Sequence, residues 1–306
     1  MAMKFRAHDT FFIRKGWLSK GMKHVVAKPD VFVDKNENPT DILGIGANMV
    51  KALRYWLPVV GLTSESKQRG KRIQELTPLG ELIYRYDRYI EELGTLYLLQ
   101  YEFATKREEA AAWYFFFNEF SMSEFTKEDF VQAIQNYIMM SEDETPVAIR
   151  SISEDFTCII NTYLPRYKSN PARVSPENNI DCPFGELGLV DILNKEKKTY
   201  KKSIPAAKSL NPWVAFAVIL AQENENEKIT NIKRDEIGLN ELLTKPGNIG
   251  RVFNLDSITM LDVLHEIEKL EKIKIIRTAG LDVIHINEQM TFEECVEKYY
   301  ESIEKG

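Results

Sequence analysis

Apolar residues recur at helical spacing in three stretches near the start of the chain. Residues 8–26 and 47–57 each place most of their apolar side chains on one face, which predicts two amphipathic helices. Residues 39–43 predict a short helix or turn between them. The remaining side of helix 47–57 is polar, so we expect that side to face solvent.

A hairpin is predicted directly after these helices. One short strand begins at residues 61–63, and a second strand is expected over residues 73–77. The intervening segment 66–72 is expected to be a loop, and it carries four basic residues. Helices followed by a basic hairpin are typical of a winged helix-turn-helix, in which one helix enters the major groove of DNA and the hairpin contacts the backbone.

The middle of the chain is predicted to be helical. Leu, Tyr and Phe are frequent over residues 89–120, and amphipathic helices are predicted over 123–140 and 153–164. Residues 165–183 are polar and rich in Pro and Asn, which predicts a domain junction or a long surface loop. Residues 184–205 are expected to form a short helix and a loop.

The C-terminal third again places helices before a hairpin. Helices are predicted over residues 239–243, 249–253 and 256–270, and the alternating pattern of residues 270–286 predicts strand, turn and strand. The patterns together predict a mainly α fold. Its three parts are an N-terminal winged helix-turn-helix (1–88), a central helical domain (89–205) and a C-terminal winged-helix-like unit (206–306).

Charge is distributed unevenly along the chain. The formal net charge is −6, yet residues 1–72 contain 14 Lys and Arg against 6 Asp and Glu. An acidic protein with a basic end usually offers that end to a polyanion, although a solvated basic face would give the same composition. No apolar run reaches the ~18–20 residues that a membrane span needs, so no membrane partner is expected. The three cysteines form no CxxC pair, which is typical of a cytoplasmic protein.

The candidate DNA-binding residues lie in the first predicted helix, on the polar face of helix 47–57, and in the hairpin. Lys and Arg can donate hydrogen bonds to phosphates or to guanine, and Asn can pair with adenine. Closely spaced cations in the hairpin repel one another unless an anion relieves them, which favours the hairpin residues as phosphate contacts. The candidates are Arg14, Lys15, Asn48, Lys51, Arg54, Tyr55, Lys67, Arg69, Lys71 and Arg72.

No pattern typical of a catalytic centre can be recognised. The four histidines make no metal-spaced pair, and the segment GIGANMVK lacks the GK[ST] ending of a Walker motif. Asp181 with Glu196 and Lys198 loosely imitates the acid and lysine arrangement of a nuclease, but these residues surround a lysine-rich turn rather than a core strand. The residues therefore identify no catalytic group, no metal ligand and no cofactor.

Six segments of the chain together resemble one bacterial family. They are Ala7–Leu18, Leu43–Leu57, the LTPLGELI helix start, Glu91–Tyr101, Asp181–Leu189 and Pro246–Asp256. The family is known as a domain of unknown function, and its genes lie beside the sulfur-transfer genes of DNA phosphorothioation. Tyr97 and Gln100 stand where the family often has Trp and His, so a histidine-dependent role of that helix is doubtful in this chain.

The resemblance implies a subunit of a DNA phosphorothioate modification and phage-defence system. Its implied partners are double-stranded DNA, a sulfurtransferase and an ATPase, and its implied activity includes metal-dependent DNA nicking, for which Mg²⁺ would be the expected ion. A second hypothesis is a non-catalytic winged-helix transcriptional regulator, or a scaffold that recruits the sulfurtransferase. A third hypothesis is a winged helix that serves protein assembly alone.

Overall fold

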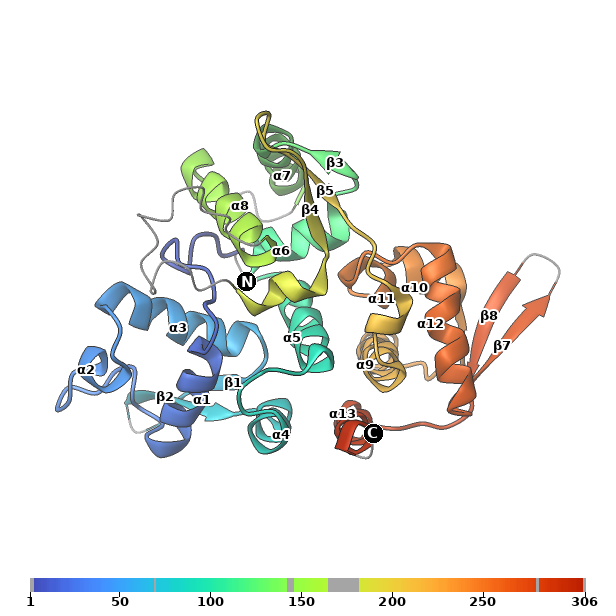
Figure 1. Cartoon of the computed structure of the whole chain (residues 1–306), viewed down its shortest axis with the longest axis horizontal. Helices are drawn as coiled ribbons and strands as arrows, with labels where there is room; N and C mark the ends of the chain where they lie inside the picture. The colour runs from blue at the N-terminus through green and yellow to red at the C-terminus, as the bar shows by residue number, and fades with distance from the viewer. Residues whose placement is uncertain (1–2, 69, 142–145, 165–181, 279–280, 305–306) are drawn as a thin grey trace.

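Helix α5 (Leu93–Thr105) lies in the middle of the molecule, with the N-terminal elements on one side and the C-terminal elements on the other (Figure 1). The computed structural model describes residues 3–68, 70–141, 146–164, 182–278 and 281–304. Within these ranges the protein is mainly helical and contains three small antiparallel sheets. None of the helices in the described part of the chain has the length and apolar character needed to cross a membrane.

The N-terminal part contains three helices, a hairpin and a fourth helix, and its three helices and hairpin follow the predicted order. The fourth helix begins where the side chain of Thr77 accepts a hydrogen bond from the backbone N–H of Gly80 at 2.9 Å. The elements are α1 (Trp17–Ala27), α2 (Pro39–Leu43), α3 (Ala47–Val59), β1 (Thr63–Gln68), β2 (Lys71–Leu76) and α4 (Pro78–Tyr86).

Two of the predicted boundaries in this part are wrong. Helix α1 begins at Trp17 rather than at residue 8, because Gly16 precedes it with φ 81° and Thr10 has φ 69°, neither of which a helix allows. Most of the expected loop 66–72 is strand, because β1 and β2 pair as far as Gln68 and Lys71. The polar composition of these strands hides the alternation by which a strand is usually recognised.

The central part contains a three-stranded sheet in the order β3-β5-β4 in addition to its predicted helices. The expectation of a helix and loop over 184–205 is therefore wrong beyond the short helix at its start, and residues 165–181 of the predicted junction lie outside the described ranges. The elements after α5 are α6 (Ala111–Tyr114), the π-helix η1 (Phe115–Glu119), β3 (Glu124–Phe125), α7 (Lys127–Met140), α8 (Ile149–Tyr163), the 3₁₀ helices η4 (Pro183–Leu187) and η5 (Ala207–Ser209), β4 (Val190–Asn194) and β5 (Thr199–Lys202).

A lysine of the central sheet closes the end of the π-helix. The ammonium group of Lys202 donates to the backbone carbonyl oxygens of Phe116 at 2.5 Å and Phe120 at 2.6 Å, and it lies over both phenyl rings. Burial and, to a smaller extent, the nearby charge of Arg251 together lower the pKa of Lys202 to about 7. The side chain thus fastens β5 to the C-terminal end of η1.

The C-terminal part follows the predicted order of helices and hairpin and adds a third strand, so its sheet has the order β6-β8-β7. Its last helix, α13, lies beside α4 of the N-terminal part (Figure 1). There the rings of Tyr86 and Tyr300 stack with 5.1 Å between their centroids. The elements are α9 (Pro212–Thr230), β6 (Glu236–Gly238), α10 (Leu239–Thr244), α11 (Ile249–Val252), α12 (Ser257–Lys269), β7 (Ile273–Thr278), β8 (Leu281–Ile286) and α13 (Phe292–Glu304).

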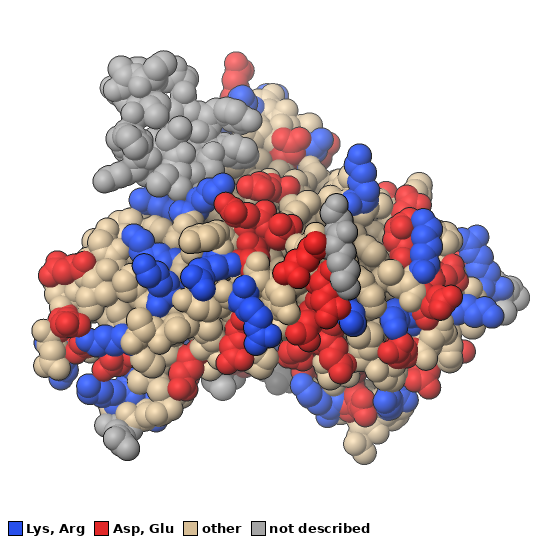
Figure 2. Space-filling model, turned by 60° about the horizontal axis from the view of Figure 1, so that its bottom comes forward, with Lys and Arg blue, Asp and Glu red and all other residues tan. Residues whose placement is uncertain are grey.

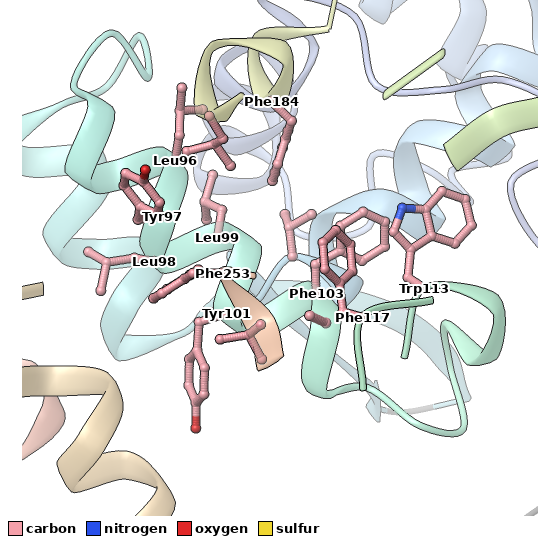
Figure 3. Packing of buried hydrophobic residues seen from close by; sticks show 14 of the residues in the cluster. Leu96, Tyr97, Leu98, Leu99, Tyr101, Phe103, Trp113, Phe117, Phe184 and Phe253 are labelled. Atoms are coloured by element: carbon pink, nitrogen blue, oxygen red, sulfur yellow. The ribbon is translucent and has the colours of Figure 1, made fainter. Parts of the chain in front are cut away.

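Helix α5 is apolar on almost every side and forms the centre of the core. Figure 3 shows Leu96, Leu98 and Phe103 extending from it in different directions, with Phe253 from the C-terminal part packed against it. The apolar side chains buried in the three predicted parts form one cluster, and the boundaries between these parts stay a prediction.

Buried hydrogen bonds join α5 to its neighbours. The hydroxyl group of Tyr163 in α8 donates to Oε1 of Gln100 at 2.5 Å, and Nε2 of Gln100 donates to the carbonyl oxygen of Val252 at 3.1 Å. Both polar ends of the Gln100 side chain are thus satisfied inside the protein. The residue that stands in place of the family's common histidine links α5 to α8 and α11.

Candidate nucleic-acid interface

Helix α3 presents a narrow polar face to solvent because most of its surface is buried. Leu53, Trp56 and Leu57 have no exposed area, whereas Asn48 and Lys51 are exposed. The indole N–H of Trp56 donates to the carbonyl oxygen of Phe11 at 2.9 Å. The position of the polar face is therefore set by packing on the opposite side of the helix.

A buried acid and histidine hold the N-terminal segment against α3. Nε2 of His8 lies 2.6 Å from Oδ1 of Asp155, and the backbone N–H of Arg6 donates to the same carboxylate at 2.9 and 3.1 Å. The ring of His8 stacks on Trp56, with 5.6 Å between the ring centroids. Burial raises the pKa of Asp155, and the hydrogen bonds from His8 and Arg6 oppose this effect.

An ion pair joins α3 to the β1–β2 hairpin. Nε and Nη2 of Arg54 donate to the two carboxylate oxygens of Glu65, each at 2.8 Å, and Nη1 of Arg72 lies 3.7 Å from the same carboxylate. Partial burial of Glu65 opposes its ionisation. The hydrogen bonds and charge of Arg54 outweigh that effect and hold the pKa of the carboxyl group below its usual value.

The basic side chains of the hairpin are divided between its two faces. Lys67 pairs with Arg72 across the strands, and side chains of one face alternate with those of the other, so Glu65 shares the face of these two cations. Lys71 lies on the opposite face, where its ammonium group is 3.1 Å from the carboxylate of Asp30. Acids of the protein itself therefore relieve part of the repulsion that the sequence predicted.

A groove of about 560 Å³ lies between α3, β1 and the segment that follows α5. Its basic lining includes Lys51, Arg54 and Arg72, which the sequence identified as candidates, and Tyr55 forms part of the wall. The hydroxyl group of Tyr55 donates to the carbonyl oxygen of Glu109 at 2.8 Å, which fixes the segment after α5 beside α3.

Two basic residues of this groove escaped the sequence analysis. Lys4 comes from the N-terminal segment, and Lys106 follows α5 and pairs with Glu102 at 3.2 Å. Neither lies in a basic run, so no local sequence signal identifies them. The tertiary structure alone brings them to α3.

Two of the sequence candidates, Arg14 and Lys15, do not line this groove. Arg14 and Lys15 precede α1 and border a small depression beside Tyr89, away from the groove, and the guanidinium group of Arg14 lies 5.4 Å from the ring of Trp17. Arg69 lies outside the described residues. The structure therefore groups Lys51, Arg54, Tyr55 and Arg72, with Asn48 on the same helix and Lys67 on the same face of the hairpin.

Lys51 and Lys67 are two exposed cations of this surface. Neither Lys51 nor Lys67 has a carboxylate partner within the described ranges; the contact of Lys51 is with the amide oxygen of Asn48 at 3.5 Å. On the face of the molecule that Figure 2 shows, acidic side chains gather near the middle and basic side chains are interspersed on both sides. Unpaired cations therefore matter more for anion binding than the total number of basic residues.

The described residues contain no group of three or more His, Cys, Asp or Glu side chains that could hold a metal ion. Asp181, one residue of the loosely nuclease-like arrangement, lies outside the described ranges. All three cysteines are buried and none forms a disulfide, and burial raises the pKa of Cys295 to about 12. The described side chains thus offer anion binding as their clearest chemistry.

Comparison with known proteins places this geometry in a family. No curated protein matches the chain. The solved structures that match it include an SspB crystal structure with a TM-score of 0.83 and a magnesium ion-bound SspB crystal structure with a TM-score of 0.82. Each is 25% identical to this chain, and each alignment covers 99% of this chain and 89% of the other. The family model for DUF4007, a protein of unknown function, matches residues 5–300, so this chain belongs to the DUF4007 family.

Proposed function

We propose that this protein is a DNA-binding subunit of a phosphorothioate modification system and that α3 with the β1–β2 hairpin forms its winged-helix contact with duplex DNA. The observation that carries the proposal is the grouping of Lys51, Arg54, Lys67 and Arg72 on one surface of an otherwise acidic chain. Such a surface attracts the phosphate backbone at long range and releases its counterions on contact.

The likeness to SspB over nearly the whole chain supports this assignment, together with the phosphorothioation context that the family resemblance implies. The basic surface favours a subunit of a modification system over a transcriptional regulator. Contacts to phosphates position a protein on DNA without specifying a sequence. A footprint restricted to one sequence would support the regulator instead. Co-purification with a sulfurtransferase would support the proposed system.

Removal of the basic side chains tests the DNA-binding surface. The variant Lys51→Ala/Lys67→Ala/Arg72→Ala should bind a fluorescent duplex on the order of 100-fold more weakly at 0.1 M salt, since three phosphate contacts are lost. The slope of log K against log salt concentration should become shallower by about 2–3. Fluorescence anisotropy over a salt series measures both quantities.

A matched control removes three exposed cations from the other end of the molecule. The variant Lys269→Ala/Lys274→Ala/Arg277→Ala makes the same change in net charge on α12 and β7. It should retain the affinity and salt slope of the unmodified protein within about twofold, because short-range contacts rather than net charge hold the DNA. Equal losses in the two variants, or no loss in the first, would refute the proposed surface.

Nicking of DNA with Mg²⁺ is a separate part of the proposal. One of the similar SspB structures is magnesium ion-bound, which supports this choice of metal. The residues on α3 and the hairpin are assigned to DNA binding, not to the cut, because the described residues offer no metal-binding cluster. Incubation of supercoiled plasmid with the protein and Mg²⁺ tests the activity. Conversion to open circles supports a nickase; no conversion with Mg²⁺, Mn²⁺ or Ca²⁺ refutes nicking by the isolated protein.

A further inference from the structure

Glu65 occupies the middle of the basic surface and engages two of its arginines. Its carboxylate accepts two parallel hydrogen bonds from Arg54 at 2.8 Å each, and Arg72 approaches one of the same oxygens at 3.7 Å. A guanidinium group binds a phosphate in the same forked geometry in which it binds a carboxylate. We infer that Arg54 and Arg72 form a site for one backbone phosphate of DNA, and that Glu65 occupies this site in the free protein. The inference rests on the proposed function.

Neighbouring side chains hold Arg54 and Glu65 in place. Nε2 of the buried Gln74 donates to the carbonyl oxygen of Arg54 at 2.8 Å and approaches the carboxylate of Glu65 at 3.5 Å. Oγ1 of Thr63 donates to Oε1 of Gln74 at 3.3 Å. The backbone at Arg54 is thereby tied to the hairpin, so the guanidinium group can change partners without movement of the helix.

The site is open to a ligand on its groove side. Arg54 and Glu65 keep 24% and 30% of their side-chain area exposed, and both line the groove of about 560 Å³. Lys4 and Lys51 line the same groove, so a phosphate that enters meets further positive charge. A phosphodiester carries the charge and acceptor oxygens needed to replace the carboxylate of Glu65 in this position.

The opposing interpretation is an ordinary ion pair that stabilises the hairpin. Partly exposed ion pairs of this kind contribute little to stability. Glu65, however, neutralises cations on the surface that is proposed to bind DNA. The two interpretations predict different effects on DNA binding. If the pair only stabilises the hairpin, removing the charge of Glu65 should lower the affinity for DNA or leave it unchanged. If Glu65 occupies a phosphate site, the same change should release the two arginines and raise the affinity for DNA.

The substitution Glu65→Gln removes the charge and preserves the size of the side chain. Binding to a fluorescent duplex should tighten roughly threefold to tenfold, because DNA no longer has to displace a carboxylate from a forked pair. The slope of log K against log salt concentration should steepen by about 1, because the site then presents one more positive charge that no carboxylate compensates. Glu75→Gln is the matched control, since it removes the same charge from the same hairpin on the opposite face.

A second comparison assigns the gain to Arg54. Arg54→Ala should weaken DNA binding at least threefold more in the Glu65→Gln background than in the unmodified protein, because only the released guanidinium group contributes fully. If Glu65→Gln proves poorly folded by circular dichroism, Glu65→Ala replaces it with the same expectation. Anisotropy titrations of all variants with one duplex, at matched salt concentrations, give the required affinities.

The outcomes separate this inference from the proposed function. Tighter binding by Glu65→Gln with no change in Glu75→Gln supports the occupied phosphate site. Equal gains in both variants, or unchanged or weaker binding by Glu65→Gln, overturn it while the DNA-binding proposal stands. Failure of the unmodified protein to bind any duplex at low salt overturns the proposed function itself.

Discussion

Replacement of Asp155 by alanine should separate the N-terminal segment from the helix that carries the candidate site. Asp155 is 1% exposed, and its carboxylate accepts hydrogen bonds from His8 and from the backbone of Arg6. In Asp155→Ala these buried donors lose their acceptor, at about 1–3 kcal/mol for each unsatisfied group. We therefore expect the free energy of unfolding to fall by about 3–5 kcal/mol, the range measured when one member of a buried pair is removed.

Glu154 provides a matched control beside Asp155 in sequence. Its carboxylate also contacts the N-terminal segment, through the guanidinium group of Arg6, and it pairs with Arg150 at 2.9 Å. These contacts lie at the surface, so Glu154→Ala should cost less than about 1 kcal/mol. The contrast between neighbouring acids tests whether burial, rather than the number of partners, sets the loss.

Urea denaturation followed by tryptophan fluorescence and circular dichroism measures both variants. Tryptophan fluorescence reports directly on the region, because His8 stacks on Trp56 and lies 5.6 Å from Trp113 between ring centroids. Asp155→Ala should also bind DNA more weakly, since α3 loses part of its support. A loss of less than 1 kcal/mol in Asp155→Ala, or an equal loss in Glu154→Ala, would refute the reasoning.

Two further substitutions test the packing and the buried charge. Gly80→Ala should destabilise the protein by about 3 kcal/mol, because its added Cβ would lie 2.0 Å from the carbonyl oxygen of Leu62, whereas Gly238→Ala, with nothing within 4 Å, should cost less than about 1 kcal/mol in the same urea titration. Burial lowers the pKa of Lys202 to about 7, so the unfolded chain holds this proton at higher pH than the folded protein does. The stability of the unmodified protein relative to Lys202→Met should therefore rise between about pH 7 and pH 10. A difference in stability that stays constant with pH would contradict the lowered pKa of Lys202.

Strong local patterns explain the parts of the fold that the sequence predicted. Helix α7 begins after Thr126, which forms a capping box with Asp129 in the structure. The apolar spacing of residues 256–270 likewise predicted α12, whose buried positions include Met260 and Leu264. In both helices the periodic face and the start signal are encoded within one short segment.

The missed strands lack such a pattern. The exposure of β4 alternates along the strand, but its apolar residues do not, because Leu193 lies on the exposed side, and β5 has no buried residue. Strand β1 was predicted to begin at residues 61–63, but it is polar after Thr63, and its last residues 66–68 were expected to be part of a loop. These strands form through pairing with their neighbours, which a periodicity within one strand does not report.

The candidate site could be predicted where it depends on one element and not where it depends on several. The polar face of α3 identified Lys51 and Arg54 because their neighbours on the other side of the helix are apolar. The contribution of Lys106, and the pairing of Lys71 with Asp30, arise between residues far apart in the chain. The sequence thus indicated where positive charge is concentrated, but the structure was needed to show which cations remain unpaired.

The most direct test of the DNA-binding surface is to map where duplex DNA touches the protein. Photo-crosslinking to a duplex that carries a reactive group on its backbone, followed by mass spectrometry of the peptides, locates the contact without reference to affinity. Crosslinks should concentrate in α3 and the β1–β2 hairpin, between Ala47 and Leu76, and should disappear in Lys51→Ala/Lys67→Ala/Arg72→Ala. Crosslinks confined to the C-terminal part, or unchanged in that variant, would contradict the account.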